Sequence, residues 1–212
     1  MPEPEGQTPA AAAPPAPAYE AIGLVELQSI AWGVDVADVM VKAAPVDFID
    51  TFMVTPGKYI VLVHGDPSSV ESSVTAGRQA ASDQVLDWLL IPFVHPRVLP
   101  AIRNRSGCDR VAALGLIETA SVASGIVAAD RAAKAADVQL LQLVLARGIG
   151  GKSMLTLTGS LFDVQAAVEA GRAEAESGGR LVATRVIPNP HPDLAARVLA
   201  ASRDGEERGA RP

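Results

Sequence analysis

The sequence predicts an α/β fold of the α+β type, built from two tandem repeats that each run βαββαβ, with a four-stranded antiparallel sheet and helices on one face. Three observations predict it. The chain matches itself along its length, each copy alternates β-rich runs with helical stripes, and each copy has a hairpin signal near its centre. The chain has 212 residues, 49% of them hydrophobic, which is enough for two small cores.

The internal repeat preserves the order of its segments. The run GLVE at 23–26 returns as GLIE at 115–118, an offset of 92 residues (115 minus 23). The offset grows to 94 (151 minus 57) and then to 96 (187 minus 91), each time where a loop is expected. Two repeats therefore follow one another without permutation, over about residues 21–102 and 113–202.

Each repeat begins with a strand and an amphipathic helix. Residues 21–29 form a short apolar run, which predicts a strand. In the helix that follows, apolar positions recur three and four residues apart: Val36, Val39, Met40, Ala43 and Ala44. Asp38 and Lys42 are four residues apart, which places both on the polar face of this helix.

A β-hairpin occupies the middle of the repeat. The β-rich runs at 48–54 and 58–64 are separated by the turn sequence TPG at 55–57. The last strand of each copy ends at Ile91 and Ile187, where a proline follows.

The second helix of each copy has a recognisable start. Asp66 precedes a proline, and Ser160 is followed by an acid three residues later; both are typical N-caps. Each helix then carries one stripe: Val70, Ser73, Val74, Gly77 and Ala81 in the first copy, and Val164, Ala167, Val168, Gly171 and Ala175 in the second. A glycine inside a helix costs about 1 kcal/mol relative to alanine. Its occurrence in both stripes predicts a close approach of each helix to the sheet.

We expect a first domain at 19–107 and a second at 108–202. The Ala/Pro-rich residues 1–18 and the charged residues 203–212 are expected to be solvated tails. The N-terminal segment is acidic and interrupted by prolines, so no secretion signal is expected.

Composition argues against several classes of function. The net charge of -6 attracts no phosphate backbone, and 4% aromatic residues leave few stacking platforms, so we expect no nucleic-acid partner. The apolar stretch 111–129 contains Glu118 and hydroxyl residues, so no membrane span is expected. A single cysteine, Cys108, excludes a disulfide within the chain and fits a reducing cytoplasm.

One motif resembles a phosphate-binding P-loop. The sequence ARGIGGKS at 146–153 has alanine in place of the first glycine. A P-loop must lead into a helix, whereas 152–158 is predicted to be a strand. We therefore interpret the motif as a glycine-rich hairpin turn.

No catalytic or metal-binding residues are predicted. The three histidines, His64, His95 and His191, lack the spacing of metal ligands, and two of them are repeat equivalents beside prolines. Glu26 and Glu118 are also repeat equivalents, which indicates a shared scaffold and not an acid–base pair. Lys42 and Lys134, each after an aspartate, are either solvated lysines or markers of an assembly edge.

The segments GLVELQSIAWGVDVADVMVKAA, TPGKYIVLVHGD, GIGGKSMLTLTGSLFDV and VIPNPHPD resemble, in order and spacing, the shell proteins of bacterial microcompartments. The resemblance covers nearly the whole chain outside the tails and is strongest to the tandem-domain, trimeric type of propanediol-utilisation compartments. It implies two microcompartment shell domains per chain. A homotrimer would then form a pseudohexagonal tile, and tiles would pack edge to edge with other shell proteins.

The resemblance also implies roles for residues. The pore loops of the family correspond to Thr55, Pro56 and Gly57 in the first repeat and Ile149, Gly150 and Gly151 in the second. The edge lysine corresponds to Lys42 and Lys134, and the motif near the domain end corresponds in the second repeat to the run containing Asn189 and His191. In that run Asn189 replaces the arginine of the family.

One departure concerns cofactors. Relatives of this type carry a cysteine before Pro-Gly-Lys that ligates an iron–sulfur cluster at the pore, and here that position is Thr55. A hydroxyl is not a cluster ligand, so we expect no cluster and no cofactor.

We therefore expect a non-catalytic shell tile in the cytoplasm whose pore passes small polar metabolites by passive diffusion. Encapsulated enzymes are a further possible class of partner. Two other classes stay open: a trimeric ligand-binding regulator of the same topology, with its effector between the repeats, and an enzyme, for which the motifs offer no convergent polar site.

Overall fold

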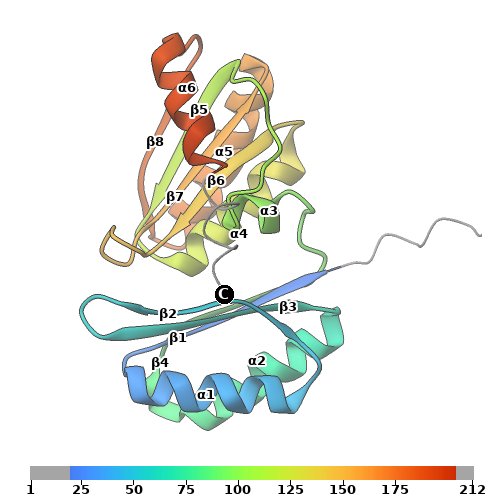
Figure 1. Cartoon of the computed structure of the whole chain (residues 1–212), viewed down its shortest axis with the longest axis vertical. Coiled ribbons are helices and arrows are strands. Elements are labelled where there is room, and N and C mark those ends of the chain that lie inside the picture. Colours follow the sequence, from blue (N-terminus) through green and yellow to red (C-terminus); the bar gives the residue numbers. More distant parts are fainter. Residues whose placement is uncertain (1–19, 204–212) are drawn as a thin grey trace, which may run out of the picture.

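The computed structural model describes residues 20–203, in which two four-stranded antiparallel sheets have the same strand order. Figure 1 shows the two sheets, each with its own pair of long helices. The expected tails at 1–18 and, beyond residue 203, at the C-terminus lie outside the described residues. The two-repeat prediction is confirmed.

The first domain contains these elements: β1 (Ala21–Leu27), α1 (Ile30–Ala43), β2 (Asp47–Val54), β3 (Lys58–Gly65), α2 (Pro67–Ala81), a 3-10 turn (Ser82–Gln84) and β4 (Val85–Ile91). Its sheet has the order β2-β3-β1-β4. The predicted βαββαβ order is therefore present, although β1 ends two residues earlier than expected.

The second domain repeats the same order: β5 (Ala113–Thr119), α4 (Val122–Ala135), β6 (Gln139–Leu145), β7 (Ser153–Gly159), α5 (Leu161–Ser177) and β8 (Leu181–Ile187). Its sheet has the order β6-β7-β5-β8. Strand pairing is equivalent in the two sheets, with Leu24 opposite Leu89 in the first and Leu116 opposite Arg185 in the second.

Two helices were not predicted from the sequence. Helix α3 (Val98–Ile102) follows β4 and packs against β6 of the second domain. Helix α6 (Pro192–Ala201) follows β8, and its Val198 and Leu199 pack near Leu114, on the face of the second sheet that α4 and α5 leave uncovered. The boundary between the two domains stays a prediction.

The helix starts and stripes of α2 and α5 are confirmed. The carboxylate of Asp66 accepts backbone N–H hydrogen bonds from the first turn of α2, and the hydroxyl of Ser160 accepts one in α5. The buried residues of both helices are the predicted ones. In α1 the prediction was partly wrong, because Ala43 is exposed and Ala44 lies beyond the helix end.

The glycines inside α2 and α5 were predicted to mark a close approach of each helix to the sheet, and this prediction is wrong for α2. A Cβ on Gly77 would lie 2.6 Å from Cγ of Met40, so α2 approaches α1 there and not the sheet. A Cβ on Gly171 would lie 2.5 Å from Cδ1 of Ile117 in the sheet and 3.0 Å from the carbonyl oxygen of Ala128 in α4. Gly171 therefore approaches both the sheet and a helix.

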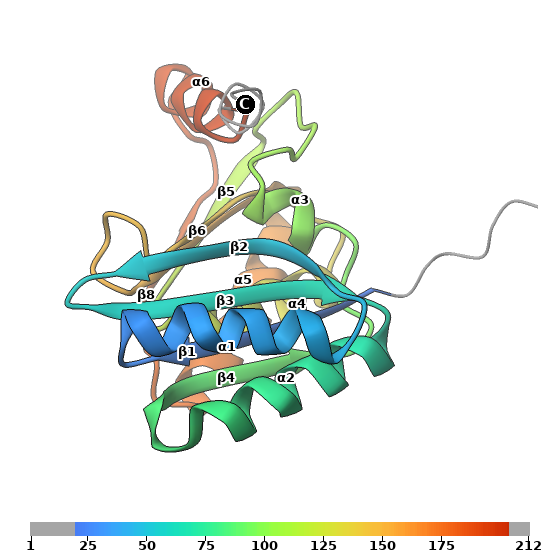
Figure 2. The ribbon, with the colours of Figure 1, turned by 60° about the horizontal axis from the view of Figure 1, so that its bottom comes forward.

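The first sheet has a core on each face. One core lies between the sheet and its own helices and contains Val36, Met40 and Val74. The opposite face contributes Leu24, Leu62 and other residues to a core shared with the second domain. Figures 1 and 2 show this stacking: the first sheet lies between α1 and α2 on one side and the second domain on the other. The second domain is therefore seated on the first sheet.

Candidate functional site

The two hairpin loops predicted to line a pore lie side by side. Residues 55–57 join β2 to β3, and residues 146–152 join β6 to β7. Both loops project from the same end of the molecule in the two views (Figures 1 and 2). A Cβ on Gly151 would lie 3.7 Å from Cγ1 of Val54 at the end of β2. The fold therefore brings together two segments that are almost a hundred residues apart in sequence.

Glycines set the shape of both loops. Gly57 has a φ of 106° and donates its backbone N–H to the carbonyl of Val54 over 2.8 Å. Gly150 has a φ of 66°. Side chains rarely adopt these backbone conformations, so glycine is needed for each tight turn. The second loop leads into strand β7 and not into a helix, so its interpretation as a hairpin turn is confirmed.

A partly exposed ion pair stands at the base of each loop. Lys58 lies 2.9 Å from the carboxylate of Glu26, and Lys152 lies 2.8 Å from that of Glu118. These pairs are repeat equivalents, which supports the interpretation of the glutamates as part of a shared scaffold. The sequence analysis did not identify the lysines; the signal was available, because each lysine directly follows a loop in both copies.

Arg147 connects the second loop to the first domain. Its guanidinium lies 2.7 Å from the carboxylate of Asp50 in β2 and 4.6 Å from the centre of the Phe52 ring. This contact between the domains was missed, because nothing in the sequence pairs these positions. All three cations near the loops, Lys58, Lys152 and Arg147, thus have carboxylate partners, and the loop tips themselves are uncharged.

The residues predicted at the tile edge lie away from the loops. Lys42 is in the last turn of α1, and its side chain is 73% exposed and 2.5 Å from Asp38. Chain direction places it far from the loop at 55–57. The eight-residue strand β2 runs between them and spans roughly 26 Å at 3.3 Å per residue.

Lys134 has a different environment from its equivalent Lys42. It lies 2.7 Å from Asp130, whose side chain is only 5% exposed. The other carboxylate oxygen of Asp130 accepts the backbone N–H of His95 over 2.8 Å. Asp130 therefore joins α4 to the segment that leaves the first domain.

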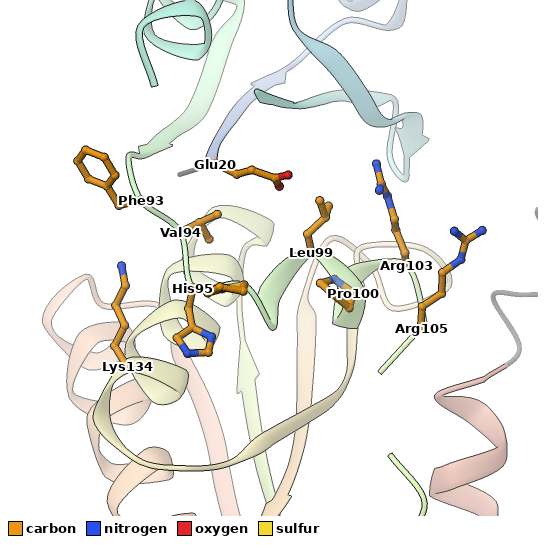
Figure 3. A pocket seen from close by; sticks show the side chains of 10 residues that line it. Glu20, Phe93, Val94, His95, Leu99, Pro100, Arg103, Arg105 and Lys134 are labelled. Atoms are coloured by element: carbon orange, nitrogen blue, oxygen red, sulfur yellow. The ribbon is translucent and has the colours of Figure 1, made fainter. Parts of the chain in front are cut away.

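Lys134 also borders a hollow of about 520 Å³ between the domains. Figure 3 shows its lining, which includes Glu20, Phe93, His95, Leu99 and Arg103. Burial lowers the pKa of His95, and the charges of Arg97 and Lys134 lower it further against the opposing effect of Asp130. His95 is therefore neutral at pH 7, and its Nδ1 accepts the backbone N–H of Arg97.

Asn189 and His191 lie at the junction of β8 and α6. Both are exposed, and Nδ1 of His191 accepts the backbone N–H of Asp193 over 3.3 Å at the start of α6. Among the described residues no hydrogen bond or ion pair joins them to Lys42 or Lys134. The structure thus does not gather the four predicted edge residues into one cluster within a single chain.

The described residues 20–203 offer neither a metal site nor a membrane span. That part of the chain contains no group of three His, Cys, Asp or Glu side chains placed to hold a metal ion. Cys108 is buried, and its thiol donates a hydrogen bond to the carbonyl of Arg110 over 3.2 Å. None of the helices in this range is long and apolar enough to cross a membrane.

Comparison with known proteins identifies both repeats. The model of the BMC domain family matches residues 21–94 and 113–190. The chain is 40% identical over 175 residues to the bacterial microcompartment shell protein PduT of Citrobacter freundii, covering 82% of this chain and 95% of that protein. It is 30% identical over 193 residues to the carboxysome assembly protein CcmO of a Synechocystis strain, covering 84% of this chain and 64% of that one.

Solved structures show the same architecture. A microcompartment protein from Desulfitobacterium hafniense DCB superposes with a TM-score of 0.80 at 51% identity, covering 84% of this chain and 98% of that one. A fused permuted hexameric shell protein superposes with a TM-score of 0.54 at 23% identity, covering 74% and 82% of the two chains, and this likeness concerns the fold alone.

Proposed function

Because the chain belongs to the BMC domain family and is a bacterial microcompartment shell protein, we propose that three copies close into a pseudohexagonal tile with a central pore. The proposed role is structural and not catalytic, and the proposed location is the shell of a microcompartment in the cytoplasm. The name of its 40% identical relative, a shell protein, supports the structural role.

The observation that carries this proposal is the unequal burial of two equivalent helices. Helix α4 packs on its own sheet and also faces the first domain, and its Val122 and Ile126 are fully buried. The equivalent residues of α1, Ile30 and Val34, are 37% and 56% exposed. Within one chain, therefore, the interface at α4 is formed, whereas the equivalent surface of α1 has no domain packed against it.

A second copy supplies the missing interface. The outer face of the second sheet corresponds to the face of the first sheet on which the second domain is seated. If it covers α1 of the next copy in the same way, the head-to-tail contact repeats and closes into a ring. Six similar domains in two unequal kinds require three chains.

The pore is proposed at the axis of this ring, where the loops at 55–57 and 149–151 would meet from all three copies. Its lining would consist of glycines, the rings of Pro56, the aliphatic side chains of Ile149 and the hydroxyls of Thr55, with the nearby cations already paired. Such a lining suits passive diffusion of small polar metabolites. Thr55 offers no thiolate, so the proposed pore carries no iron–sulfur cluster.

The opposite end of each domain is proposed as the tile edge. Lys42 and Lys134 stand at that end of their domains, with Asn189 and His191 as further candidates for contact with neighbouring shell proteins. Proteins enclosed by the shell are a further proposed class of partner.

The edge is tested by replacing Lys42 and Lys134 with alanine and imaging the purified protein by negative stain. We expect wild-type protein to form hexagonally spaced sheets and the double variant to remain as separate trimers of three times 21.9 kDa. A matched control is Arg78→Ala with Arg172→Ala, which removes two repeat-equivalent cations from α2 and α5 and should leave the sheets intact. Sheets formed by the edge variant would contradict the edge assignment.

One observation favours a second candidate function, the trimeric regulator. The hollow of about 520 Å³ lies between the repeats, where an effector of such a protein would bind. Tight binding of a small effector in this hollow, together with no sheet formation by the wild-type protein, would replace the shell role with a regulatory one.

A further inference from the structure

A small hollow between the domains shows which residues meet where α4 faces the first sheet. It has a volume of about 260 Å³ and lies between the edge strand β4 and helix α4. Trp88 and Leu89 line it from β4, and Ser124 and Val127 line it from α4. Leu89 is 6% exposed, and Val127 packs against the shared core. At Leu89 and Val127 the contact within the chain is therefore apolar.

The repeat identifies the equivalent residues at the unfilled interface. Leu89 pairs with Leu24 in β1, and Arg185 pairs with Leu116 in β5, so Arg185 is the equivalent of Leu89. By the same register Thr184 is the equivalent of Trp88.

The helices give the other half of the equivalence. Helices α1 and α4 both have 14 residues and start at Ile30 and Val122. Asp35 is therefore the equivalent of Val127, and Trp32 is the equivalent of Ser124.

Charge changes in a coordinated way between the two interfaces. The apolar residues Leu89 and Val127 are replaced by Arg185 and Asp35, which have opposite charges. Both are exposed in the single chain. Arg185 donates to the carbonyl oxygen of Thr184 over 2.6 Å, and neither residue has an ion-pair partner among residues 20–203. One change alone would bury an unpaired charge, whereas both together form a pair.

The residues next to Leu89 and Arg185 on the strands point away from this contact. Trp88 lies under the guanidinium of Arg78 in α2, 3.6 Å from the centre of its ring, and so faces the helices of its own domain. Its equivalent Thr184 pairs with Ile117, which approaches Gly171 in α5. The charges of Asp35 and Arg185 therefore carry the inference.

We propose that Asp35 of one copy forms an ion pair with Arg185 of the next copy and that this contact fixes the order of domains in the ring. The proposal rests on the proposed trimer. A first domain set on another first domain would place Asp35 against Leu89. A second domain set on another second domain would leave Arg185 facing Val127. Each wrong pairing buries an unpaired charge, so only alternating domains close the ring.

The test is a charge exchange. Asp35→Arg and Arg185→Asp each place like charges together, so we expect the concentration at which half the protein is trimeric to rise by about tenfold or more. The double variant restores opposite charges and should return this concentration to within about threefold of wild type. Glu71→Arg, a charge reversal on exposed α2, is the matched control and should change nothing. Sedimentation over a dilution series measures all four.

A chemical cross-link checks the geometry independently of affinity. In a Cys108→Ser background, Asp35→Cys with Arg185→Cys should yield covalent dimers and trimers with a short bismaleimide, and Glu71→Cys with Arg185→Cys should not. Unchanged trimers in both single charge variants, or no rescue in the double variant, would overturn the pairing while leaving the trimer standing. A wild-type protein that stays monomeric would overturn the trimer itself and the pairing with it.

Discussion

Helices α1 and α4 have the same length and the same place in their domains, yet they differ in how much of their surface the chain buries. Gly33, Val36, Ala37 and Met40 are the buried residues of α1. In α4 nine residues are buried, among them the charged Asp130. The two repeats fold in the same way but pack against different neighbours. The residues at which their sequences differ therefore reflect those neighbours as well as the shared fold.

The outer faces of the two sheets differ in the corresponding way. Leu62 and Leu89 on the first sheet are buried by the second domain, whereas their equivalents on the second sheet are Thr156 and Arg185. The first face is covalently tied to its partner and never needs to meet water after folding. On the second face Thr156 is buried and α6 packs nearby against Leu114, whereas Arg185 is exposed. The part of this face at Arg185 stays in water until another copy arrives, so a charged side chain suits it.

The largest effect on stability is expected when a residue on the outer face of one sheet is replaced by its equivalent from the other sheet. Leu62→Thr places a hydroxyl in the fully buried core shared by the domains and should lower the free energy of unfolding by about 3 kcal/mol. The reverse change, Thr156→Leu, removes a hydroxyl from a buried position but also adds bulk there, so the two effects oppose each other and the free energy of unfolding should change by less than about 1 kcal/mol. Urea unfolding of both variants measures this. Equal losses would show that the two faces are energetically alike and contradict the comparison.

The next largest difference in stability is expected between alanine variants of two equivalent helix aspartates, Asp130 in α4 and Asp38 in α1. Asp130→Ala leaves the partly buried N–H of His95 without its acceptor and removes the partner of Lys134, so we expect a loss of about 2 kcal/mol. Asp38→Ala breaks only an exposed pair and should cost less than about 0.5 kcal/mol. Thermal unfolding compares them. A loss for Asp38→Ala as large as that for Asp130→Ala would contradict the special role of Asp130.

A smaller difference in stability is expected between alanine variants of the two helix glycines, Gly171 in α5 and Gly77 in α2. Gly171→Ala pushes a methyl group toward the carbonyl oxygen of Ala128, which is fixed by the helix, and should destabilise the protein by about 1 to 2 kcal/mol. Gly77→Ala meets the flexible side chain of Met40 and gains about 1 kcal/mol of helix propensity, so its net effect should be near zero. Denaturant midpoints report both, and the reverse order would show that the close contact at Gly171 is relieved by backbone movement.

The smallest effect concerns the two N-caps. Hydrogen bonds from Ser69 and Ser68 lower the pKa of Asp66 from its ordinary 3.8 to about 2. Its contribution to stability is therefore complete above about pH 4 and is lost as the pH falls toward 2. Ser160 does not titrate, so Ser160→Ala should cost about 1 kcal/mol at every pH.

The measurement for this last pair is the difference in free energy of unfolding between each variant and wild type at pH 7, 4 and 2. For Asp66→Ala the difference should shrink between pH 4 and 2, and for Ser160→Ala it should stay constant. A constant difference for Asp66→Ala would show that its carboxylate is not the titrating cap.

Local sequence signals predicted most of each domain. Stripes spaced for helices, the turn sequence at 55–57 and the caps at Asp66 and Ser160 depend on near neighbours, and the repeat made each signal visible twice. Helix α3 was missed because five residues hold no measurable periodicity. The contacts of Arg147 with Asp50 and of Asp130 with His95 were missed because they depend on how the two domains stack, which no local pattern records.

The most direct test of the unequal burial of α1 and α4 is the native mass of the purified protein, measured by light scattering over a range of concentrations. The account predicts a trimer of three times 21.9 kDa, because each copy leaves one of two equivalent interfaces unfilled. A monomer of 21.9 kDa at every concentration would contradict it, and the exposed face of α1 would then need another explanation.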